Sequence, residues 1–201
     1  MTNSGKRQKK YTDKAMEVFK RDGLRMSLDE LSGKMGVTKK TLYNHFESKE
    51  ILLCQCVMSM MNDMKEQIGM TMKKADNPVE SLINAFVEVD NYFSSLSPIF
   101  FYDMRKMYPE YARPEHATGF GFLNQYILEY VNIGVLEGYF RQDLQVQLVS
   151  EYISYSSFSY YFNKLIENNS SETKNFFSKI IVFNLRALVS EKGSKVLNIK
   201  L

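Results

Sequence analysis

The chain has 201 residues, of which 44% are hydrophobic, so it is long enough for one sizeable domain or two small ones and too apolar for a disordered protein. Its formal net charge is only +3, but residues 1–50 carry twelve Lys and Arg against seven Asp and Glu, whereas residues 51–201 carry fourteen against sixteen. The positive charge is concentrated at the N-terminal end, which favours an anionic partner there.

Several other classes of protein are disfavoured by the same sequence. No apolar stretch is long enough to span a membrane, and residues 1–10 are polar and basic with no apolar segment behind them, so we expect no membrane partner, no export signal and a cytoplasmic location. Cys54 and Cys56 are one residue apart on an expected helix and point in different directions, and His45 and His116 are far apart. We therefore expect no disulfide, no metal and no cofactor.

The apolar spacing is helical nearly throughout, and glycine and proline are scarce. This pattern predicts an all-α fold of about nine helices, with a frayed tail from Glu191 onward. Asp143 is expected to cap the eighth helix and Ser171 the ninth. The expected helices cover about 9–21, 27–36, 38–46, 48–74, a helix from 78, then 98–107, 114–137, 144–167 and 172–190.

Residues 27–46 predict two short helices joined by a tight turn. Ser27 and Glu30 have the spacing of a capping box, Gly36 suits the reversal of the chain, and Thr38 can cap the second helix. In a helix-turn-helix, the first helix braces on the phosphate backbone and the second presents its N-terminal residues to base edges. Lysines on an exposed helix face and short polar groups beside them suit these two tasks.

The candidate DNA-binding residues share this window or the first turn of the next helix. Each of these residues also has an ordinary structural explanation. Lys39 and Lys40 could be solvated surface charges, and His45 could pack at the end of a helix. Ser27 and Thr38 could simply cap their helices. It is the combination of these residues in one window that indicates DNA binding. The candidates are Ser27, Thr38, Lys39, Lys40, Thr41, Tyr43, Asn44, His45 and Lys49.

Three segments in this order resemble the N-terminal signature of the TetR family of transcriptional regulators: Gly36-Val37-Thr38, Thr41-Leu42-Tyr43 and His45-Phe46-x-Ser48-Lys49-Glu50. The resemblance covers about residues 11–53. It implies a DNA-binding domain over 1–53, with its helix-turn-helix at about 27–46, and a regulatory, ligand-binding and dimerisation domain over 54–201. Lys40 departs from the family pattern, in which a small residue is common, so the operator sequence cannot be carried over.

The region after residue 54 is rich in aromatic residues and methionine. These side chains could form an ordinary packed core. Inward-facing aromatic residues with a few polar groups also suit a mostly apolar ligand pocket. The residues expected to line such a pocket are Phe93, Phe100, Met104, Phe120, Leu123, Tyr126 and Phe158.

The expected helices over 144–167 and 172–190 are apolar on more than one face, which indicates burial on two sides. One side would face the domain core and the other a second subunit, in a four-helix interface with two-fold symmetry. The alternative is a buried helical hairpin in a monomer. The expected interface residues are Tyr152, Tyr155, Phe176, Ile180, Phe183 and Ala187.

These features together predict a ligand-responsive transcriptional regulator that binds a palindromic DNA operator as a homodimer. We expect a repressor that a small, mostly apolar effector releases; the alternatives are an activator of the same fold or a helical adaptor that has lost DNA binding. An enzyme is not expected, because the sequence shows no nucleophile–base pair and no glycine-rich phosphate loop. Glu80, Glu88 and Asp90 are interpreted as an acidic, solvated face.

Overall fold

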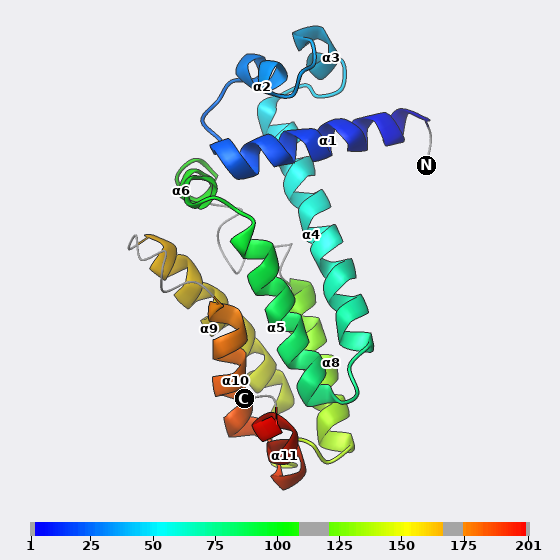
Figure 1. Ribbon diagram of the computed structural model, residues 1–201, viewed down its shortest axis with the longest axis vertical. Helices are drawn as coiled ribbons and strands as arrows, with labels where there is room; N and C mark the ends of the chain where they lie inside the picture. The colour runs from blue at the N-terminus through cyan, green and yellow to red at the C-terminus, as the bar shows by residue number, and fades with distance from the viewer. Residues whose placement is uncertain (1–2, 109–120, 167–174, 200–201) are drawn as a thin grey trace. The chain divides into compact units, whose positions relative to one another are not determined.

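The computed structural model describes residues 3–108, 121–166 and 175–199, and within these ranges the chain forms ten helices (Figure 1). One isolated backbone bridge joins Phe140 to Val189. The predicted all-α fold is confirmed. None of the helices in these ranges is long and apolar enough to cross a membrane.

The helices keep the labels of Figure 1, in which no α7 is marked. Glycines follow the first two helices: Gly23 follows α1 and Gly36 lies two residues after α2, with positive φ angles of 81° and 66°. The bounds are α1 Asn3–Asp22, α2 Leu28–Lys34, α3 Lys39–Tyr43, α4 Lys49–Lys73, α5 Pro78–Ser94, α6 Pro98–Met107, α8 Gly121–Leu136, α9 Val146–Ile166, α10 Phe176–Leu188 and α11 Glu191–Ile199.

The expected frayed tail is wrong, because residues 191–199 form α11. The Ser190 hydroxyl accepts the Gly193 backbone N–H at 3.2 Å, which caps the helix, and Leu197 is buried. The predicted cap of α9 is also wrong. Asp143 lies three residues before α9 begins, is exposed, and pairs with Arg141 at 3.4 Å. Ser171, the other predicted cap, lies outside the described residues.

The helices form two compact units, each with its own core. The first contains α1, α2, α3, α4 up to Asp63, and α6. α6 contacts α1, and α2 contacts both α1 and α3. This unit is wider than the predicted DNA-binding domain over 1–53, because it includes α6, which lies within the predicted regulatory domain over 54–201. The fully buried side chains of its core include Phe19, Leu31, Leu42, Phe46 and Leu52.

The second unit contains α4 from Met64 onward, α5, α8, α9, α10 and α11. Its core includes an aromatic cluster in which Phe177 lies 5.3 Å from Phe93, 5.0 Å from Phe158 and 4.6 Å from Tyr161, measured between ring centroids. Burial raises the pKa of the Tyr161 hydroxyl. Contacts among rings at these distances are favourable beyond the apolar area that they bury.

Asp90 contradicts the interpretation of a solvated acidic face on α5. It is buried, and its carboxylate accepts the backbone N–H groups of Phe177 at 2.9 Å and Ser178 at 2.7 Å. These are free donors of the first turn of α10, which Asn175 leaves uncapped. Asp90 therefore supplies the N-terminal cap of α10 from a neighbouring helix.

Candidate nucleic-acid interface

α2 is held at its start by the predicted capping box. The Ser27 hydroxyl accepts the Glu30 N–H at 3.2 Å, and the Glu30 carboxylate accepts the Ser27 N–H at 2.7 Å. The Ser27 donors lower the pKa of Glu30 below its usual value. Gly36 reverses the chain with its positive φ, and the Val37 N–H donates to the Ser32 carbonyl at 3.0 Å. α2, the turn and α3 therefore have the local geometry of a helix-turn-helix.

The start of α3 presents two threonines. The Thr38 hydroxyl caps the helix by accepting the Thr41 N–H at 3.1 Å, and the two side-chain oxygens lie 2.8 Å apart. Thr38 is exposed and Thr41 is half-buried. Both hydroxyls are thus fixed at the helix N-terminus, where backbone N–H groups suit a phosphate oxygen.

Lys40, Tyr43 and Asn44 lie three and four residues apart, so they share the outer face of α3. All three are exposed, Tyr43 by 54%. Neither the Lys40 nor the Asn44 side chain has a hydrogen bond or an ion pair within the described residues. Lys39 is also exposed but forms an ion pair with Asp29 of α2. This face therefore offers one unpaired cation, one amide and one phenol.

His45 and Lys49, which were also predicted to contact DNA, are tied to the interior of the unit. The His45 ring is half-buried, with its centroid 4.8 Å from the Tyr11 ring. The Lys49 ammonium donates to the Leu24 carbonyl, and burial lowers the pKa of this lysine. A direct contact of Lys49 with phosphate stays a prediction; the structure gives this residue an internal partner.

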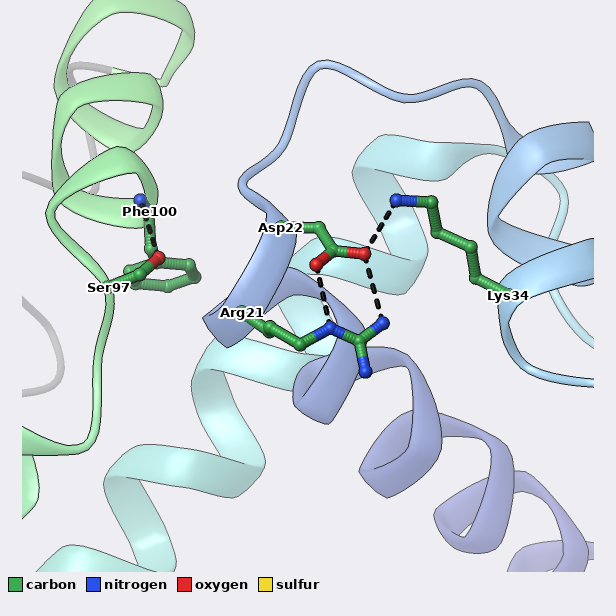
Figure 2. Close-up of polar contacts among 5 residues, drawn as sticks. All are labelled: Arg21, Asp22, Lys34, Ser97 and Phe100. Atoms are coloured by element: carbon green, nitrogen blue, oxygen red, sulfur yellow. Dashed lines mark hydrogen bonds and ion pairs between the residues drawn. The ribbon is translucent and has the colours of Figure 1, made fainter.

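An ionic contact also joins α1 to α2, as Figure 2 shows. The Asp22 carboxylate accepts from Arg21 at 2.7 and 3.0 Å and from Lys34 at 2.6 Å. These two cations, Arg21 first, hold the pKa of Asp22 well below its usual value. The same figure shows Ser97, whose hydroxyl accepts the Phe100 N–H at 3.3 Å and caps α6.

Sequence reasoning missed Asp103 of α6, which contacts the connection between α1 and α2. Its carboxylate accepts the Leu24 N–H at 2.9 Å and the Arg25 Nε–H at 2.7 Å. A signal was present in the sequence, because Asp103 falls at helical spacing with the apolar residues Phe100 and Met104. A carboxylate on the apolar face of a helix indicates a buried partner.

The predicted pocket residues are divided between the two units. Phe93, Leu123 and Phe158 are buried in the second unit, where the centroids of the two phenylalanine rings lie 6.1 Å apart. Tyr126 is half-buried there and donates to the Lys65 carbonyl at 3.3 Å. Phe100 and Met104 are instead buried on α6 in the first unit. Phe120 lies outside the described residues.

Two buried polar atoms of the second unit have no hydrogen-bond partner within the described residues. They are Oδ1 of Asn124 on α8 and Oγ of Ser157 on α9. Buried polar atoms are almost always satisfied by protein or by another molecule. The described residues contain no group of three or more His, Cys, Asp or Glu side chains that could hold a metal ion.

The predicted dimer residues form apolar surface on α9 and α10, which contact each other. Tyr152, Tyr155 and Phe183 are exposed, Phe183 by 68%. Phe176 and Ile180 are half-buried, and Ala187 is exposed. Aromatic surface of this extent on neighbouring helices is typical of a protein–protein interface.

Comparison with known proteins agrees with these features. Residues 12–56 match the model of "Bacterial regulatory proteins, tetR family". No curated protein sequence matches the chain. A transcriptional regulator from Cytophaga hutchinsonii has a similar structure, with a TM-score of 0.73 and 16% sequence identity over 92% of this chain and 99% of that one.

Two further structures are similar to most of the chain. FadR from Bacillus subtilis, in complex with stearoyl-CoA, has a TM-score of 0.68 and 18% identity over 90% of this chain and 97% of that one. The ketosteroid transcriptional regulator KstR2 of Mycobacterium tuberculosis has a TM-score of 0.59 and 19% identity over 95% and 98%. At these identities the likeness shows a shared fold.

Proposed function

Because this chain carries a tetR-family N-terminal domain and has the fold of TetR-family regulators, we propose that it is a DNA-binding transcriptional regulator. The observation that carries the proposal is the outer face of α3, on which Lys40, Tyr43 and Asn44 are exposed beside the capped N-terminus. A lysine suits a phosphate and an asparagine suits the edge of adenine. We also propose that the protein binds DNA in the cytoplasm.

The active form that we propose is a homodimer through α9 and α10. A helix as short as α3 reads few base pairs, so two copies are needed for a selective site. The exposed apolar side chains of Tyr152, Tyr155 and Phe183 support this proposal, because a two-fold interface would remove them from water. Such a dimer requires a palindromic operator with half-sites in successive major grooves.

The proposed effector is a small, mostly apolar molecule that binds in the second unit and releases the DNA, so that the protein acts as a repressor. The buried aromatic rings there, with two unpartnered oxygens on Asn124 and Ser157, support a ligand with an apolar body and a hydrogen-bonding group. The similar FadR was crystallised with stearoyl-CoA, which joins a long apolar acyl chain to a polar, charged coenzyme A group.

Fluorescence anisotropy with labelled duplex DNA tests the proposal. The purified protein should select a palindromic duplex from a random-sequence pool and bind it with an affinity that falls steeply as the salt concentration rises. Stearoyl-CoA is the first effector to add, and release of the duplex is the expected result. A folded protein that binds no duplex at low salt would refute DNA binding and favour the adaptor alternative.

A further inference from the structure

Asp103 is a buried carboxylate in the first unit that lies outside the helix-turn-helix. Its side chain is 1% exposed. An ionised group is kept in such a place only when its partners compensate for the lost water. The partners are the Leu24 N–H at 2.9 Å and the Arg25 Nε–H at 2.7 Å, both from the connection between α1 and α2.

The connection is shaped to fit this carboxylate. Gly23 has a φ of 81°, and a Cβ atom built on it would lie 2.5 Å from Oδ2 of Asp103. The Ser97 N–H, one residue before α6, donates to the Lys20 carbonyl at 3.1 Å. The Lys49 ammonium of α4 donates to the Leu24 carbonyl. Residues 20–25 are therefore held by backbone and side-chain groups of α6 and α4.

We propose that Asp103 is a positioning residue for DNA binding, which fixes the α1–α2 connection and thereby the helix-turn-helix that follows it. α2 begins at Leu28, three residues after Arg25, and leads through the Gly36 turn to α3. If the backbone at Leu24 and Arg25 can move, the start of α2 can consequently move with it. This inference rests on the proposed DNA-binding function.

The energetic consequence is a change in the fraction of molecules that are competent to bind. When only part of the population has the bound arrangement, the apparent affinity falls in proportion to that fraction. We call the two hydrogen bonds that Asp103 accepts from Leu24 and Arg25 the clasp. Removing the clasp should reduce the competent fraction to about 10–20%, which raises the apparent Kd for a selected duplex about five- to tenfold. Binding to random-sequence DNA depends mainly on charge and should change less.

The test uses the full chain with the substitution Asp103→Asn. Asparagine keeps the size of the side chain, but its single carbonyl oxygen can accept from only one of the two donors while its NH₂ group faces the other. The matched control is Asp13→Asn on α1, which removes the same charge from an exposed side chain with no hydrogen bond within the described residues. The probes are a duplex selected by the wild-type protein and a random-sequence duplex.

Two readouts decide the outcome. Asp103→Asn should weaken binding of the selected duplex more than that of the random one, and should speed hydrogen exchange at the Leu24 backbone N–H, while Asp13→Asn does neither. Equal affinity and exchange in Asp103→Asn and the control would overturn the proposal. A global loss of stability, by contrast, would reduce the fraction of active protein without changing the ratio of the two affinities.

The wild-type protein provides a measurement that does not depend on the variant folding. Its Leu24 amide, which donates to Asp103, should exchange more slowly than the Arg25 amide, for which the described part of the chain offers no acceptor. Equally fast exchange at both amides overturns the clasp. If the wild-type protein binds no duplex, the proposed function fails, and the Leu24 measurement still shows separately whether the clasp exists.

Discussion

The lysines near the recognition helix differ in what their ammonium groups contact. Lys40 is exposed and unpaired within the described residues, Lys39 is paired with Asp29, and Lys49 is bound to the Leu24 carbonyl. A phosphate must displace the existing partner of Lys39 or Lys49, whereas Lys40 exchanges only water. Lys40, the residue that departs from the family pattern, is therefore the most available cation on this face.

Substitutions on the outer face of α3 should separate affinity from selectivity. Lys40→Ala should weaken binding to all duplexes and lower the salt dependence by about one unit for each Lys40 in the complex. Asn44→Ala should instead reduce discrimination at one base pair by about 1–3 kcal/mol.

Anisotropy titrations at several salt concentrations measure both effects. Lys65→Ala, which removes the same charge from the exposed part of α4 in the second unit, is the control for net charge. A Lys40→Ala variant with the salt dependence of this control would exclude Lys40 as a phosphate contact.

Asp22 should contribute to the acid sensitivity of the fold. Its pKa is held below the ordinary 3.8 by Arg21 and Lys34. A carboxyl group of this kind stabilises the folded state above pH 3.8, and this stabilisation is lost as the pH falls through the lower, folded-state pKa. Asp22→Asn should therefore show a smaller drop in Tm on acidification, measured by circular dichroism. Parallel curves for variant and wild type would contradict this assignment.

At the scale of the helices, caps from neighbouring elements are the main features that sequence patterns did not identify. Ser27, Thr38 and Ser97 cap their own helices and could be predicted, since the donor and acceptor are three residues apart. Asp90 caps α10 from 87 residues away. Such a pairing has no local signature, because only the packing of α5 on α10 brings the groups together.

Asp90→Ala should destabilise the second unit. The change leaves the buried Phe177 N–H without an acceptor, and hydrogen bonds to charged groups contribute about 1.5–3 kcal/mol. Urea denaturation should show a loss of this size. Asn91→Ala, an exposed neighbour on α5, should stay within about 0.5 kcal/mol of wild type. Equal midpoints for the two variants would show that the Asp90 cap adds nothing.

At the scale of the whole molecule, the proposed dimer explains why α9 and α10 are apolar on two sides. Phe158 and Phe177 pack in the aromatic core, whereas Tyr155 and Phe183 face outward on the same two helices. A monomer would leave this outer surface in water. The proposed two-fold interface would cover it and place two recognition helices in one molecule.

Phe183→Glu should therefore weaken dimerisation by about thirtyfold or more, which corresponds to roughly 2 kcal/mol. Sedimentation velocity measures the association, and anisotropy should show a parallel loss of affinity for the palindromic duplex. Leu136→Glu is the control: Leu136 is 85% exposed but lies on α8, outside the predicted interface. A dimer that survives Phe183→Glu but not Leu136→Glu would place the interface elsewhere.

The sequence by itself determined the all-α class, most helix starts and the helix-turn-helix, because helical periodicity, caps and turn glycines act over three or four residues. The order of residues from Gly36 to Glu50 also determined the family resemblance. Only the tertiary structure decided that α6 belongs with the recognition helices, that residues 191–199 are helical, and that Asp90, Asp103 and Lys49 face inward. These outcomes depend on partners distant in the chain, and such pairs form only when packing brings together groups that no local pattern relates.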